Sequence, residues 1–330
     1  MIFRFTRKAI DIVMSFWLYI VLYATAIALY GLWFLPFPPN AFTLPNILIA
    51  PIMTLGSFVA GSTFLGGGAV AFPAMTKWLM MSPLLAKQFA LAIQSVGMTS
   101  ASLLIIYKLK KIPWDIYCCY LPGSMIGATI SITFLQYIIA SPDIKIGFTL
   151  FIVCFYIIFI YSRKKNYHLE EVLLDYEGKL ILLGAGFIGG LASGLIGSGA
   201  DLILFCILNL YFRLNFKTAT LLSVIAMAMT SLFSIVLVAT TSVIEMLIVD
   251  LWVIAAPIVV IGAPLGAWVC IKISEKKLFW FVSVIVLVEI VTSLVLVPIE
   301  SSKIKYFALL LISYLILFRY LLKMSRVRHL

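Results

Sequence analysis

The sequence predicts an all-α polytopic membrane protein with two inverted-topology repeats and glycine-broken, re-entrant helix hairpins. Three observations support this fold class: the composition, a series of apolar runs, and two glycine clusters at corresponding places in the two halves. Of the 330 residues, 64% are hydrophobic and only 11% are charged, whereas soluble domains are about half apolar and about a quarter charged. No polar segment is long enough for a soluble domain, so we expect helices in lipid.

The apolar runs give the order of the elements. A helix needs about 20 apolar residues to cross the hydrocarbon core, and most of the runs approach or exceed that length. Two short runs would each be about 20 Å long at 1.5 Å per residue, less than the core thickness of about 30 Å. We expect about 10–12 membrane segments, at 9–35, 46–65, 69–82, 86–107, 114–139, 144–162, 180–196, 200–212, 218–240, 247–271, 278–297 and 304–322.

A charged loop divides the chain near its middle. Residues 163–179 are expected to form a cytoplasmic linker. Before it we predict an extra N-terminal transmembrane helix at 1–45 and a first repeat at 46–162. After it we predict a second repeat at 180–297, then a C-terminal transmembrane helix and basic tail at 298–330. Each repeat has an odd number of segments, so the two have opposite orientations, as in many secondary transporters.

The distribution of lysine and arginine favours hairpins at the two short runs, 69–82 and 200–212. The net charge is +11, from 24 Lys and Arg against 13 Asp and Glu, and cytoplasmic loops carry such an excess. With a hairpin at each short run and the N-terminus inside, both termini are cytoplasmic. Few lysine and arginine residues then lie outside, namely Lys77, Lys87, Lys145, Lys303 and Lys305. If each short run instead belonged to one interrupted span, more lysine and arginine residues would lie outside. We expect a multi-pass protein of the inner, or plasma, membrane, without a nucleic-acid partner.

The two glycine clusters are the predicted substrate site. A glycine costs a helix about 1 kcal/mol relative to alanine, and non-helical backbone at membrane depth is tolerated only where it lines a cavity or is packed in protein. The short helix after each break presents its N–H groups and positive dipole end to the break, which suits a small anion. The expected substrate-binding residues are Gly66, Gly67, Gly68, Gly197, Ser198, Gly199 and Gln94, although Gln94 could instead only bond across helices.

A second glycine pattern recurs in the two halves and carries a family resemblance. Gly123 and Gly127 correspond to Gly262 and Gly266, a spacing that lets helices approach closely in lipid. With "GSTFLGGGAVAFPAM" and "GGLASGLIGSGADLIL", these patterns resemble the sulfite exporter TauE/SafE family of permeases over about 46–297. The resemblance implies a transporter of sulfite, sulfonates or related sulfur anions. The second cluster departs from it, because it reads "GSGAD" where the family more often has a fuller glycine run.

Two acidic residues in apolar runs are candidates for proton coupling or gating. Asp201 places a carboxylate beside the expected anion site, where it either caps the short helix or titrates and couples proton movement to transport. Glu289 lies in the middle of a span, where an ionisable group costs several kcal/mol unless it is paired. It is either a coupling or gating residue or a hydrogen-bonded structural acid.

Three lysines are candidates for attracting anions. Lys87 and Lys217 begin corresponding helices on opposite sides of the membrane, and Lys77 lies within a short run. They either draw anions toward the two mouths or extend to water as ordinary interfacial lysines.

The sequence contains no GxxxxGK[ST] loop, catalytic triad or clustered metal ligands, so we predict no enzyme, cofactor or metal site. The predicted function is transport of a small anion by alternating access, with proton coupling as one mechanism. The expected partners are the anion and the lipid bilayer. The sequence leaves open whether the chain forms a homo-oligomer. The alternatives are an anion channel on the same scaffold, a membrane acyl or phosphoryl transferase, and a non-transporting assembly factor.

Overall fold

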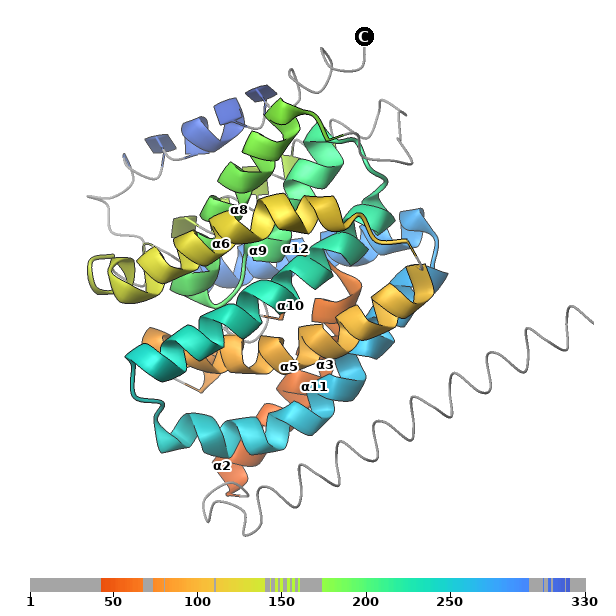
Figure 1. Cartoon of the computed structure of the whole chain (residues 1–330). Helices are drawn as coiled ribbons and strands as arrows, with labels where there is room; N and C mark the ends of the chain where they lie inside the picture. Colours follow the sequence, from red (N-terminus) through yellow and green to blue (C-terminus); the bar gives the residue numbers. More distant parts are fainter. Residues whose placement is uncertain are drawn as a thin grey trace, which may run out of the picture.

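The computed structural model describes residues 43–67, 74–79, 81–109, 111–139 and 174–296, with scattered residues between 143 and 160 and between 305 and 320. The predicted span at 9–35 and most of the linker lie outside the described residues. The regular elements of the described part are helices (Figure 1). They are α2 (Leu44–Ile47), α3 (Ile49–Ser62), η1 (Ala74–Trp78), α5 (Pro83–Leu109), α6 (Trp114–Thr133), η2 (Leu135–Tyr137), α8 (Tyr176–Ile196), α9 (Ala200–Cys206), η3 (Ile207–Tyr211), α10 (Phe216–Thr241), α11 (Met246–Lys272) and α12 (Glu275–Leu296).

Local sequence signals account for several helix ends. Asp175 accepts a hydrogen bond from the Gly178 N–H at 2.8 Å, and Asn215 accepts one from the Thr218 N–H at 2.7 Å. These side chains satisfy N–H groups that the first turns of α8 and α10 would leave open. Pro83 opens α5, where its missing N–H costs nothing. The long helices therefore lie close to the predicted apolar runs.

Among the described residues, five helices are long and apolar enough to cross a membrane: α5, α6 with η2, α8, α10 and α11. Helix α3 and the continuous α9–η3 segment are shorter and also apolar. Large apolar side chains remain exposed on the outer faces, for example Leu103 at 64% and Leu265 at 51%. Such a surface is unfavourable in water but matches a hydrocarbon environment. The prediction of a helical membrane protein is confirmed.

The two halves of the described chain pack against each other through exchanged helices. Helix α3 packs against α11, and α8 packs against α6, so the helix before each break lies on a long helix of the other half. Helices α5 and α10 pack together at the centre, and the colours in Figure 1 show that they run in opposite directions. The core is therefore shared between the halves.

The second glycine pattern forms the two exchanged interfaces. A Cβ atom on Gly123 or Gly127 would overlap backbone atoms of α8, at Leu183 and Phe187. On Gly266 it would overlap the Phe58 carbonyl oxygen of α3, and on Gly262 the Ser57 hydroxyl. The predicted close helix packing at both glycine pairs is confirmed.

The two short segments after the glycine clusters differ from each other. In the second half, α9 starts at Ala200 and continues without a gap into the π-helix η3, as expected for 200–212. In the first half, residues 68–73 lie outside the described part, and η1 is a single π-helical turn. The described part of 69–82 is thus not a regular α-helix. Such π-helical turns occur often at functional sites.

Candidate functional site

The two glycine clusters interrupt the helices, and we call them the breaks: Gly66 and Gly67 of the described first cluster, and Gly197 to Gly199. They lie against each other in the interior, and we call their contact the junction. A Cβ atom on Gly66 would overlap Oδ2 of Asp201, so the carboxyl group of the second break packs on the backbone of the first. Beside this contact, the rings of Phe64 and Phe205 stack with their centroids 3.9 Å apart. The Phe216 ring packs edge-on against both, at 5.8 and 5.2 Å. The fold thus brings together the two sequence features singled out as a site.

The backbone of the breaks needs glycine. The φ angle is 68° at Gly66, 85° at Gly197 and 126° at Gly199. Residues with a Cβ atom rarely adopt these conformations, and glycine does so without steric cost. Gly197 also ends α8, where its N–H donates to the carbonyl oxygen of Ser193 at 2.8 Å. The second cluster therefore ends α8 and leads into α9, whereas α3 ends at Ser62, before the first cluster.

Gln94 of α5 connects the two breaks. Its Nε2 donates to the carbonyl oxygen of Gly197 at 2.5 Å, and its side chain is only 2% exposed. A Cβ atom on Gly67 would lie 3.4 Å from Gln94 Cγ, which is ordinary contact distance. Gln94 thus bonds across helices, and it also lines a cavity; its role in substrate binding stays a prediction.

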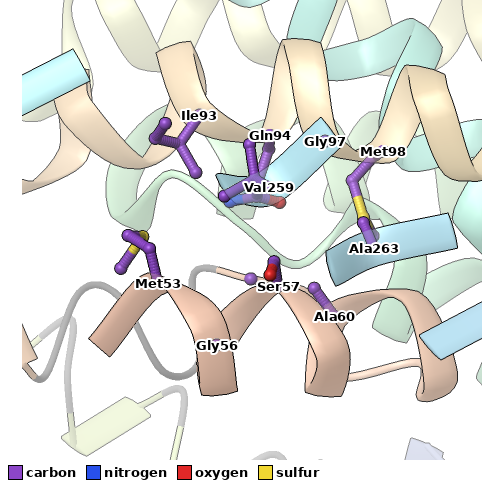
Figure 2. Close-up of a pocket in the computed structure, with 11 residues that line it drawn as sticks. Met53, Gly56, Ser57, Ala60, Ile93, Gln94, Gly97, Met98, Val259 and Ala263 are labelled. Carbon is purple, nitrogen blue, oxygen red and sulfur yellow. The ribbon is translucent and has the colours of Figure 1, made fainter. Parts of the chain in front are cut away.

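The cavity at Gln94 is small and mostly apolar. Figure 2 shows Gln94 and Met98 on α5 facing Ser57 and Ala60 on α3, with Val259 of α11 between them. Its volume is about 10 Å³, close to the least that holds one water molecule. A polyatomic oxyanion does not fit without movement of the surrounding helices. The described lining of this cavity includes Gln94 of α5 and Gly67 of the first break, but no residue of the second break.

Three buried polar atoms around the breaks have no hydrogen-bond partner among the described residues. They are Oε1 of Gln94, Oγ of Ser198 and Oδ2 of Asp201. Most buried polar atoms in proteins are paired, because an unmade buried hydrogen bond costs about 1–3 kcal/mol. The three atoms come from α5 and the second break, and Oδ2 of Asp201 packs on the first. These three atoms have unused hydrogen-bonding capacity in the part of the core that holds the breaks.

Asp201 is fully buried and only partly engaged. Its Oδ1 accepts the Leu202 N–H at 3.0 Å, but the N-cap residue of α9 is Gly199 and no side chain caps that helix. The Asp201 carboxyl group thus bonds to backbone within the first turn without being the N-cap of α9. An ionised carboxylate here would repel an anion, whereas a protonated carboxyl group can donate a hydrogen bond to one.

Several supporting residues were not predicted. Tyr120 of α6 donates its hydroxyl to the carbonyl oxygen of Ala200 at 2.7 Å, and Ser193 accepts the Ala200 N–H at 3.1 Å. Both hold the start of α9, and both come from neighbouring helices. A tyrosine in the middle of an apolar run, away from the membrane interface, was the available signal for Tyr120.

The remaining predicted residues are placed as follows. Lys87 is 2% exposed and bonds to Gln136, so it does not extend to water. Lys217 is half-buried at the start of α10. Glu289 and Lys77 lie in α12 and η1, but their side chains are outside the described part, as is Gly68. The structure therefore brings together Gly66, Gly67, Gln94, Gly197, Ser198, Gly199 and Asp201.

Comparison with known proteins identifies one related family. Residues 49–293 match the family model described as "Sulfite exporter TauE/SafE". The match includes both glycine breaks and all the helices that form their junction. No curated protein and no solved structure matches the chain.

Proposed function

Because this chain belongs to the sulfite exporter TauE/SafE family, we propose that it carries sulfite, a sulfonate or a related sulfur anion through the junction of its two glycine breaks. Family membership and the five apolar helices make it a membrane transport protein. The anion, its path and the mechanism are our proposals.

The unpartnered polar atoms at the junction support this path most directly. Gln94, Ser198 and Asp201 present an amide oxygen, a hydroxyl group and a carboxyl oxygen without a described partner. Hydroxyl and protonated carboxyl groups can donate to anion oxygens, and the Gln94 amide can rotate to direct its N–H groups inward. A few convergent polar groups in an apolar surround are typical of small-molecule sites.

Alternating access is the mechanism that we propose. The cavity is too small for an oxyanion, so substrate entry requires helices to move. The exchanged packing of α3 with α11 and α8 with α6 supports two inverted repeats with re-entrant hairpins. In such a pair, exchanging the conformations of the halves converts an inward-facing state into an outward-facing one.

Proton coupling through Asp201 follows from the charge at the junction. The anion and an ionised carboxylate exclude each other in a desolvated site, so the anion enters only when Asp201 carries a proton. Anion and proton then move together. Glu289 is the second candidate for this role, from its position in α12.

Uptake by proteoliposomes tests the proposed function. The purified full chain is reconstituted, and uptake of labelled sulfite, sulfate, thiosulfate and a small sulfonate is measured with and without an imposed pH gradient. Saturable, gradient-dependent uptake of one sulfur anion, with counterflow, supports a coupled transporter. Linear concentration dependence without counterflow would indicate a channel, and no flux above empty liposomes would contradict the proposal.

A further inference from the structure

Lys87 is a buried cation without a carboxylate partner among the described residues. Its side chain is 2% exposed, although lysine is almost never fully buried unless it is paired. Its ammonium group bonds to Oε1 of Gln136, a neutral amide. Burying a charge is costly, and a neutral amide compensates it less than an anion does. The Lys87 side chain is therefore a buried donor that no described carboxylate balances.

Gln136 lies between this charge and the surface. It is half-buried in η2, the turn that follows α6, whereas Lys87 is 2% exposed. The amide oxygen thus occupies the position where an oxygen of an incoming anion would meet the ammonium group. A carboxylate or oxyanion oxygen forms a stronger hydrogen bond with ammonium than an amide oxygen does.

Lys87 also lies next to the junction of the breaks. A Cβ atom on Gly197 would come within 3.0 Å of the Lys87 carbonyl oxygen and 2.8 Å of Ala90 Cβ. Gly197 is the residue whose carbonyl oxygen accepts from Gln94. Lys87 and Gln94 are separated by two helical turns on one face of α5, about 10 Å along the axis. The backbone of Lys87 therefore adjoins the second break, two helical turns from Gln94.

We propose that Lys87 and Gln136 form an outer anion-binding station, in which the Gln136 amide covers the ammonium group until an oxyanion displaces it. The station rests on the proposed function for its role in transport, but anion binding at Lys87 is a separate property. Its ligand class is a small oxyanion with an exposed oxygen, the same class as the substrate. Entry then proceeds by exchange of the amide oxygen for the anion oxygen on Lys87.

Two variants test the station from its two sides. Lys87→Gln removes the charge and keeps a hydrogen-bonding group, and Gln136→Glu supplies a permanent carboxylate in place of the anion. Lys108→Gln is the matched control, because Lys108 is an exposed lysine near the other end of the same helix. The measurements are KM for uptake and the shift in Tm of the purified full chain with increasing sulfite or sulfate.

We expect both Lys87→Gln and Gln136→Glu to raise KM at least about tenfold, the size of a lost charge-assisted hydrogen bond, and to reduce the anion-dependent Tm shift. Lys108→Gln should change neither. An unchanged KM and Tm shift in Lys87→Gln, or a Gln136→Glu protein that behaves like wild type, would overturn the station. If wild type carries no sulfur anion, the proposed function fails, and the Tm titration alone decides whether Lys87 binds anions.

Discussion

At the scale of single residues, glycine allows the non-helical backbone of the two breaks. Gly66 has a φ angle of 68° and no room for a Cβ atom, since Oδ2 of Asp201 occupies that space. A side chain there has two costs, the left-handed backbone and the displacement of a buried carboxyl group. Gly184, by contrast, lies within α8 with nothing near its would-be Cβ. Gly66 is therefore required by its backbone and its neighbours, whereas Gly184 is not.

Gly66→Ala should therefore destabilise the protein, and Gly184→Ala should not. The left-handed conformation alone costs about 1–2 kcal/mol for a residue with a Cβ atom, while alanine within a helix gains up to about 1 kcal/mol over glycine. Thermal unfolding of the two purified variants in the same detergent measures the difference. Equal Tm values for the two variants would contradict the claim that Gly66 cannot accept a side chain.

The charge of Asp201 is the residue-scale test of coupling. We expect Asp201→Asn to keep anion exchange but to lose dependence on the pH gradient, because asparagine is neutral at every pH and carries no proton. Uptake with and without an imposed gradient should then be equal. Asp250→Asn serves as the control, since Asp250 is another buried acid with an unpartnered oxygen in α11, outside the breaks.

The same measurement on Glu289→Gln decides which acid couples proton movement to transport. If Asp201→Asn keeps the gradient dependence of wild type and Glu289→Gln abolishes it, coupling belongs to α12. If neither substitution changes the dependence, coupling through either acid is excluded.

At the scale of helices, two interfaces depend on glycine in the same way. In α6 and α11 the glycine pairs allow backbone contact with α8 and α3, and Gly190 of α8 lies equally close to the Ser124 carbonyl oxygen of α6. Van der Waals contact between closely packed backbones is a main source of helix association in lipid. The interfaces therefore tolerate almost no added volume.

Gly127→Val and Gly266→Val should each lower stability by about 1–3 kcal/mol, the usual cost of overpacking, or prevent folding. Gly184→Val adds the same volume to a glycine of α8 that faces open space, and should be recovered normally. Monodisperse yield by size-exclusion chromatography and Tm provide the comparison. Normal yield and Tm for both interface variants would show that the close packing is unimportant.

The sequence predicted the helices well but not their contacts. Long apolar runs and residues such as Asp175, Asn215 and Pro83 mark helix ends locally, so α5, α8 and α10 lie near their expected positions. The glycine spacing also predicted close helix packing, although not which helices meet. The π-helical form of η1 has no local sequence signal.

The candidate site was also predicted only in part, because local patterns are visible in the sequence and contacts between distant residues are not. Glycines with an unusual backbone are visible in sequence because a cluster in an apolar run has a clear cost. The contacts of Gln94 with Gly197 and of Tyr120 with Ala200 join residues distant in sequence, and they depend on how whole helices pack. No pattern along the chain reports such contacts.

At the scale of the whole molecule, exchange of helices between the halves places both breaks in one core. Helix α3 lies on α11 and α8 on α6, so each break is supported partly by the other half. In the proposed alternating-access mechanism, opening the junction shifts these pairs relative to each other. The exchanged packing brings two glycine clusters that are distant in sequence together in one core.

The most direct measurement is labelled-sulfite uptake into proteoliposomes by Gly67→Ala, compared with Gly184→Ala and wild type. A methyl group at Gly67 enters the cavity of about 10 Å³ beside Gln94 at ordinary contact distance, whereas at Gly184 it extends into open space. We predict that Gly67→Ala folds, with a normal elution profile, and loses uptake, while Gly184→Ala retains it. Uptake by folded Gly67→Ala at the wild-type rate would show that the anion does not pass through the junction of the breaks.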